Sequence, residues 1–213
     1  MIADHIHDAL AQVRKLREIV LQKKLFKGYS GRARITCGVV ALAGAAVLSS
    51  EAVSPDPLSH LAGWGAVLAV GLVINYAALA YWFLFNSEAG RNPLMLKPAI
   101  DAVPALAVGA ALSVALILTE QYDLLFGAWM CLYGLAQVAY RQSLPPGIYL
   151  VGLCYITAGA YCLLSACSAL HLPWPPVSFT NPWPMGIVFC LGEVAGGIAL
   201  IRDNNRTEAR SND

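Results

Sequence analysis

Apolar runs of bilayer length are the feature that most constrains this chain. They fall near residues 33–50, 61–85, 99–118, 124–140, 147–170 and 185–201. A helix needs about 20 mostly apolar residues to cross the hydrocarbon core of a membrane, and most of the runs are close to that length. Apolar and aromatic residues make up 58% of the 213 residues and charged residues only 13%, which excludes an ordinary water-soluble domain. We therefore expect an all-α integral membrane protein with six transmembrane helices.

The basic residues sort in a way that supports six spans and sets an orientation. If the spans alternate, all 14 Lys and Arg residues lie on one side, including Arg32 and Arg34, which we expect at interface depth. The connections on the opposite side hold no Lys or Arg; their charged residues are Glu51, Asp56, Glu120 and Asp123. Loops rich in Lys and Arg stay in the cytoplasm. We expect a protein of the bacterial cytoplasmic (inner) membrane with both termini inside.

This topology divides the chain into three parts. Residues 1–30 form a cytoplasmic amphipathic helix and a turn, residues 31–201 a six-helix transmembrane domain, and residues 202–213 a cytoplasmic tail. The leader helix is predicted from apolar residues at alternating steps of three and four: Ile2, Ile6, Ala9, Val13, Leu16 and Val20. Such a face needs a partner. Anionic lipid, a second copy of the helix and another membrane subunit all remain open.

Small-residue patterns repeat along the spans. Gly44, Gly109 and Gly159 align the odd spans, and Gly65, Gly127 and Gly186 align the even spans. Their matching order predicts three tandem helical hairpins.

The segments "RITCGVVALAGAAVLSS" and "LAGWGAVLAVGLVINY", and later "GIYLVGLCYITAGAYCLL" and "NPWPMGIVFCLGEVAGGIALI", resemble hairpin units of the HdeD-like acid-resistance membrane proteins of bacteria. The resemblance implies six spans in three hairpins. It carries no catalytic residue onto this chain. The leader helix and the Pro/Trp-rich last outer loop depart from the family pattern.

Glu193 is an acid in the middle of the last apolar run, and a buried acid in a membrane needs a hydrogen-bonding partner. The other even spans offer Asn75, Gln137 and Tyr133, so we expect these residues and Glu193 to form an intramembrane polar cluster. One interpretation is a proton or cation relay; the other, which we favour, is polar contacts that hold helices together. Gly192 and Gly196 flank the acid as GxxxG, a spacing that favours close approach of a neighbouring helix.

Other candidate sites lie near the ends of the spans. Trp174 and Trp183, in the Pro/Trp-rich segment 171–186, suit an interfacial aromatic belt or a docking surface for another subunit. His60 and His171 leave haem or quinone binding open, although positions at the rim disfavour it. We expect bound lipids. We expect no metal, no other cofactor and no nucleic acid.

No motif of a soluble enzyme occurs in the chain, so we expect no catalytic activity. The expected function is a non-catalytic accessory or scaffolding subunit of a larger membrane complex, in contact with membrane lipids and other membrane protein subunits. The alternative is a small proton-coupled transporter or membrane stress-protection protein that uses Glu193.

Overall fold

The computed structural model describes residues 10, 12–13, 30–85, 103–139, 145–167 and 177–212 of the chain. Within these ranges the chain is helical and contains no strand. A short 3-10 turn, η4 (Tyr122–Leu124), precedes α6. The long helices are α2 (Gly31–Leu48), α3 (Pro57–Phe85), α5 (Val103–Leu118), α6 (Leu125–Ala139), α7 (Pro146–Ala166) and α8 (Trp183–Asn212). The expected all-α class is confirmed.

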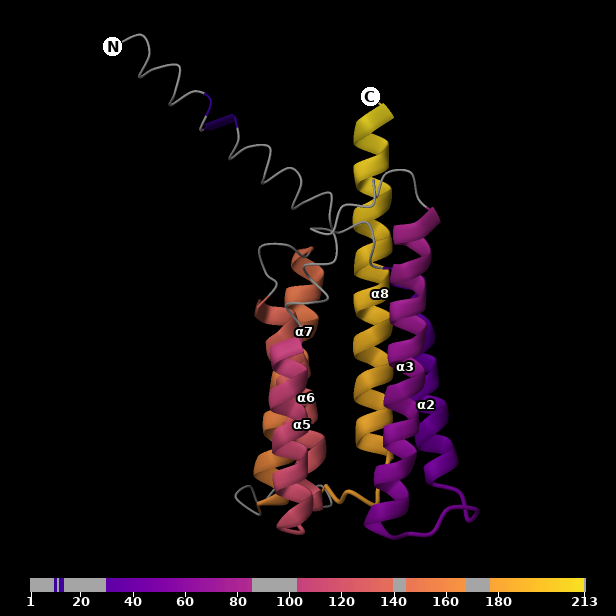
Figure 1. The fold of residues 1–213 in the computed structure, drawn as a ribbon, viewed down its shortest axis with the longest axis vertical. Helices are drawn as coiled ribbons and strands as arrows, with labels where there is room; N and C mark the ends of the chain where they lie inside the picture. Colours follow the sequence, from indigo (N-terminus) through magenta and orange to yellow (C-terminus); the bar gives the residue numbers. More distant parts are fainter. Residues whose placement is uncertain are drawn as a thin grey trace, which may run out of the picture.

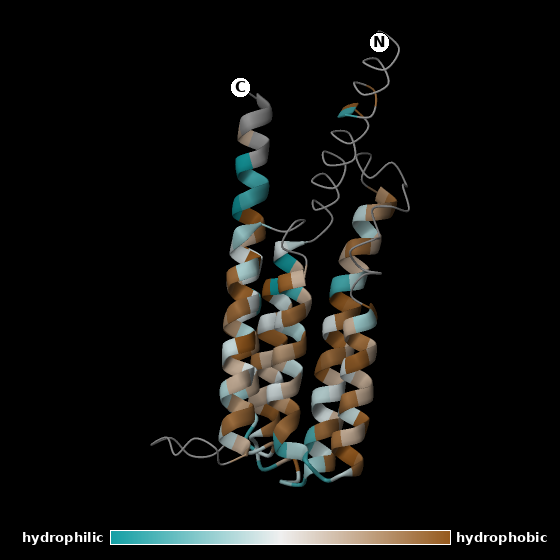
Figure 2. Ribbon diagram, turned by 90° about the vertical axis from the view of Figure 1, so that its left-hand side faces the viewer, coloured by the Kyte–Doolittle hydropathy of each residue, from teal (hydrophilic) through white to brown (hydrophobic). Residues whose placement is uncertain are grey.

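Four of these helices are long and apolar enough to cross a membrane: α2, α3, α7 and α8. α5 is a shorter apolar helix of 16 residues and α6 has 15 residues. Figure 2 shows apolar residues along most of the helical length and hydrophilic residues in the connections and in the C-terminal part of α8. The leader helix lies outside the described residues except at positions 10 and 12–13. Six crossings and their orientation stay predictions.

Local sequence explains where two helices begin. The Ser30 hydroxyl caps α2 by accepting a hydrogen bond from the Ala33 N–H at 3.3 Å. The Asp56 carboxylate does the same for α3, accepting from the Ser59 N–H at 2.9 Å. Ser and Asp are favoured at this position because a short oxygen-bearing side chain reaches the free N–H groups of the first turn.

The helices form two units of three (Figure 1). The first unit holds α2, α3 and α8, and the second holds α5, α6 and α7. The first and last described long helices, α2 and α8, are therefore neighbours. Of the expected hairpins, α2 packs on α3 and α5 packs on α6, whereas α7 and α8 divide between the units. α7 makes its larger contact with α6 and α8 with α2, and the contact between α7 and α8 joins the two units.

Glycines line the close contact within the first unit. A Cβ on Gly31 of α2 would lie 2.5 Å from the Gly197 carbonyl oxygen of α8, and a Cβ on Gly38 would lie 3.0 Å from the Cys190 carbonyl oxygen. Real Cβ atoms essentially never come within less than 3.0 Å of another heavy atom, and a distance of 3.0 Å is tighter than nine in ten real Cβ contacts. α2 and α8 run in opposite directions, and only glycine at these positions lets their backbones touch.

The second unit repeats this construction. A Cβ on Gly127 of α6 would lie 2.7 Å from the Gly159 carbonyl oxygen of α7, and a Cβ on Gly134 would lie 2.6 Å from that of Gly152. Both helices thus carry two glycines seven residues apart, which keeps them on one face of a helix. Each unit is therefore built on one antiparallel, glycine-lined helix pair.

Aromatic side chains fill the core at one end of the bundle. This loop end is defined by the connections 49–56, 119–124 and 177–182. The Phe179 ring lies 4.9 Å from that of Phe126, and the Phe179 N–H donates to the Asp123 carboxylate at 2.7 Å. Phe126 also meets Trp64 of α3 edge to face, with ring centroids 5.8 Å apart. The loop end therefore packs the two units together around apolar rings.

The polar cluster around Glu193

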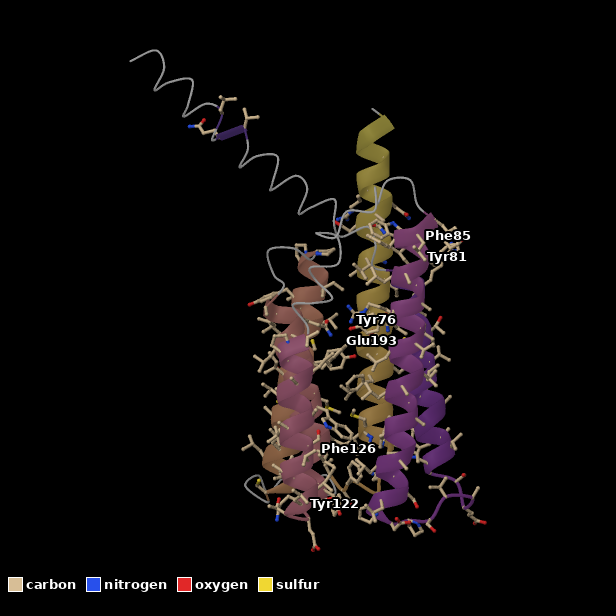
Figure 3. The ribbon with its side chains drawn as sticks, viewed as in Figure 1. Tyr76, Tyr81, Phe85, Tyr122, Phe126 and Glu193 are labelled. Atoms are coloured by element: carbon tan, nitrogen blue, oxygen red, sulfur yellow. The ribbon has the colours of Figure 1, made fainter. Side chains whose placement is uncertain are left out.

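Glu193 lies in the interior of the bundle, about midway along the helices, where the two units face each other (Figure 3). Only 4% of the residue is exposed. α8 presents it on the face that also carries Gly197 and Leu200, both of which are buried. An acid in such a place requires several donors, because a charge removed from water is otherwise strongly destabilising.

Arg34 of α2 supplies two of these donors. Its Nε donates to Glu193 Oε2 at 2.9 Å and its Nη2 donates to Glu193 Oε1 at 2.8 Å. This is a bidentate arrangement, in which the planar guanidinium matches the planar carboxylate. Arg34 is itself only 6% exposed. A buried ion pair therefore joins α2 to α8.

Two tyrosines of the other unit complete the set of donors. The Tyr133 hydroxyl of α6 donates to Glu193 Oε1 at 2.7 Å, and the Tyr155 hydroxyl of α7 lies 3.2 Å from the same oxygen. The Tyr155 hydroxyl also lies 3.3 Å from the Phe189 carbonyl oxygen. The rings of Tyr133 and Tyr155 meet edge to face, with centroids 5.1 Å apart. We call Arg34, Tyr133, Tyr155 and Glu193 the Glu193 cluster.

The Glu193 cluster combines contacts within the first unit with contacts between the two units. The ion pair lies within the first unit, because both Arg34 and Glu193 belong to it. The tyrosine hydroxyls come from the second unit, so their hydrogen bonds cross the boundary. Glu193 is thus the residue on which four helices from both units meet.

The two glycines beside Glu193, Gly192 and Gly196, leave space for the side chains of Tyr155 and Arg34. A Cβ on Gly196 would lie 3.0 Å from Arg34 Cζ, and a Cβ on Gly192 would overlap the Tyr155 ring. We expected this GxxxG to admit a neighbouring backbone. The structure instead uses both glycines to make room for partners of Glu193, while Gly197, the next residue, meets the Gly31 backbone.

Sequence reasoning missed two members of the Glu193 cluster, Tyr155 and Arg34. We expected Arg34 at interface depth among the cations that set topology, whereas Arg34 lies one turn inside α2 and is buried. A signal was available: Gly31, Arg34, Gly38, Ala41 and Ala45 follow one another at steps of three or four and are all buried. A cation on the small-residue face of a helix faces another helix, because small residues mark close packing.

The other expected members of the cluster take different positions. The Asn75 amide of α3 donates to Cys37 Sγ at 3.0 Å and to the Gly71 carbonyl at 3.0 Å, so its amide N–H bonds go to these atoms. Gln137 of α6 is buried one turn from Tyr133, and neither atom of its amide has a hydrogen-bonding partner among the described residues. Of the three expected partners, the structure brings Tyr133 to Glu193.

The remaining expected contact residues are partly described. Val13 and Trp183 are exposed, the latter at the first position of α8. His60 is buried near the loop end. The expected residues that lie outside the described ranges are Ile2, Ile6, Leu16, Val20, His171 and Trp174. Within the part of the chain that the structure describes, no group of His, Cys, Asp and Glu is arranged to hold a metal ion.

The long apolar helices are those of a helical membrane protein. Comparison with known proteins adds no family: no protein-family model, no curated protein and no solved structure matches the chain.

Proposed function

We propose that this protein is a non-catalytic accessory or scaffolding subunit of a larger membrane complex. In this proposal it crosses the bacterial inner membrane six times, with both termini in the cytoplasm. The Glu193 cluster holds the two units of the protein in one arrangement. The outer helices of the protein face lipid and the helices of partner subunits.

The observation that carries the proposal is the saturation of the Glu193 carboxylate. One oxygen accepts from Arg34 Nε, and the other has Arg34 Nη2 and the hydroxyls of Tyr133 and Tyr155 within 3.2 Å. A proton relay needs a carboxylate oxygen that a proton carrier can approach. Both oxygens of Glu193 are instead occupied by the guanidinium and the two hydroxyls, and Arg34 is buried beside Glu193 as its counter-ion. The geometry therefore favours a structural role.

The outer helices supply the surface for partners. α5 has no buried residue, and the most apolar stretch of α3 has none either. Large apolar side chains on these helices are exposed, among them Leu68, Val73, Leu106 and Val114. Both lipid tails and the transmembrane helices of other subunits fit such surfaces.

Purification in a mild detergent, followed by mass spectrometry of what accompanies the protein, tests the proposal. We expect the wild type to bring down defined membrane proteins, and a chain lacking residues 1–27 to lose some of them. Gly65→Ala is a control, because a Cβ at Gly65 meets nothing within 4 Å. Recovery of the wild type as a lone monomer in the native membrane extract would overturn the proposal.

A second candidate is a small proton-coupled transporter or stress-protection protein, to which the resemblance to HdeD-like proteins belongs. One observation favours it: the buried Gln137 amide, without a partner among the described residues, lies one turn from Tyr133. A polar group of that kind suits a passing solute or a second arrangement of the units.

The two candidates differ in a flux measurement. Proteoliposomes are loaded with a pH-sensitive dye, and wild type is compared with the neutral pair Arg34→Gln with Glu193→Gln, which leaves no buried charge unpaired. A proton flux in wild type that the neutral pair abolishes, with the bundle still folded, would support the transporter. Equal traces for wild type and empty liposomes would support the scaffold.

A further inference from the structure

Two buried polar atoms near the loop end have no hydrogen-bonding partner among the described residues: His60 Nε2 and Trp64 Nε1. Both residues lie on α3 and both are more than nine-tenths buried. A buried polar atom without a partner destabilises the folded state, so such atoms are rare in folded proteins. Two of them within one turn of a helix point to a shared partner.

The hydrogen-bonding roles of the two atoms follow from the geometry. His60 Nδ1 lies 3.1 Å from the Asp56 carbonyl oxygen. A carbonyl can only accept, so Nδ1 carries the proton. In a neutral imidazole the other nitrogen is then an acceptor. The indole N–H of Trp64 is a donor only. One orphaned atom therefore offers a lone pair and the other offers a proton.

From helix geometry we infer that the two side chains reach the same region. Residues four apart lie on one face of a helix, and a long helical side chain leans toward the N-terminus, over the preceding turn. Trp64 thus leans toward the turn that carries His60. Its ring rests against Phe126 at an interplanar angle of 83°, and Leu48 lies against the nearby Gly63. These neighbours offer no polar side-chain atom.

We propose that His60 and Trp64 form a binding site for one buried water molecule. The water oxygen accepts a hydrogen bond from the Trp64 indole N–H, and one water O–H donates a hydrogen bond to His60 Nε2. A carbonyl ligand would satisfy only the indole, and a metal ion would satisfy only the imidazole. A hydroxyl satisfies both, and water is the hydroxyl that fits among side chains this closely packed. The site ties the start of α3 to the aromatic core of the loop end.

Magnetic resonance on the full chain in lipid nanodiscs, labelled with nitrogen-15 in His and Trp, tests the proposal. The His60 signal is assigned by its loss in His60→Gln. We expect protonation at Nδ1, a hydrogen-bonded Nε2, and a cross peak between bound water and the Trp64 indole proton. A free Nε2, or an indole proton without that cross peak, would overturn the proposal.

A stability comparison gives a second test. Trp129 Nε1 donates to the Ser113 hydroxyl at 2.7 Å, so Trp129→Phe shows what losing one indole hydrogen bond does to the melting temperature. If water binds as proposed, Trp64→Phe lowers the melting temperature in the same way, and this decrease is smaller in a variant that also carries His60→Leu. If Trp64→Phe leaves the melting temperature unchanged or raises it, the indole has no partner and the proposal is wrong.

Discussion

At the scale of single residues, the fold depends on two buried charges, and each is stable in the interior because the other neutralises it. Glu193 and Arg34 are both buried and bind each other through two hydrogen bonds. Replacing a buried pair with apolar residues is often harmless, whereas removing one partner costs about 3–5 kcal/mol because the other charge is left unpaired. The two residues are therefore expected to depend on each other.

Glu193→Gln should destabilise the protein by about 3–5 kcal/mol, because Arg34 keeps its charge. Combining it with Arg34→Met should recover much of that loss, since no buried charge remains. Thermal unfolding in detergent of both single variants, the double variant and the wild type measures the coupling. If the stability losses of the two single variants simply add in the double variant, Arg34 and Glu193 do not stabilise each other.

At the scale of elements, glycine sets the distance between paired helices. Gly134 of α6 packs directly on Gly152 of α7, whereas a Cβ on Gly65 of α3 would meet nothing within 4 Å. The two positions are both helical glycines and differ mainly in what they face. They therefore separate the effect of close packing from the intrinsic helix propensity of glycine.

Gly134→Val should push α6 and α7 apart and lower stability by about 1–3 kcal/mol or more, as overpacking does. Gly65→Ala should be neutral or stabilise by up to about 1 kcal/mol, because alanine favours a helix. Melting temperatures of the two variants in the same detergent check this. Equal effects would mean that the glycine contact between α6 and α7 does not set their spacing.

The start of α3 should respond to pH through Asp56. The N–H of Ser59 donates to its carboxylate and lowers the pKa of Asp56. A lowered folded-state pKa stabilises the fold above the unfolded value of about 3.9, and this contribution disappears as the pH falls through the folded pKa. Asp56→Asn keeps a capping oxygen but cannot titrate. Wild type should therefore lose more stability than Asp56→Asn between pH 5 and pH 2, measured by thermal unfolding; equal losses would contradict the prediction.

At the scale of the whole molecule, two three-helix units are joined by different chemistry at two levels. Aromatic rings and the connection 177–182 join them at the loop end, and the tyrosine hydroxyls join them at the Glu193 cluster. The extended C-terminal part of α8 carries the hydrophilic residues Arg202, Asp203 and Arg206 beyond the apolar stretch.

The orientation can be measured directly. We expect protease-sensitive tags at either terminus to survive in intact spheroplasts, because the basic residues keep both ends in the cytoplasm. A tag inserted within residues 51–55 should be cleaved in the same preparation, and lysis should expose all three. Cleavage of a terminal tag before lysis would contradict the six-span topology.

The sequence by itself determined the class and the positions of the helices. Runs of apolar residues can be recognised without knowing which helices touch, because the preference of a segment for hydrocarbon depends on its own composition and length. It also singled out Glu193, because an acid in an apolar run needs a partner wherever it lies, and it named Tyr133 among the candidates.

Only the tertiary structure decided which helices pair. Arg34 and Glu193 are 159 positions apart in the chain, and α8 reaches α2 by leaving its expected hairpin partner α7 in the other unit. Helix pairing in a membrane depends on shape and on a few polar contacts, because lipid tails already satisfy apolar surfaces. Hydropathy alone therefore does not distinguish one apolar neighbour from another, and the partner of a buried charge becomes visible once the helices are packed.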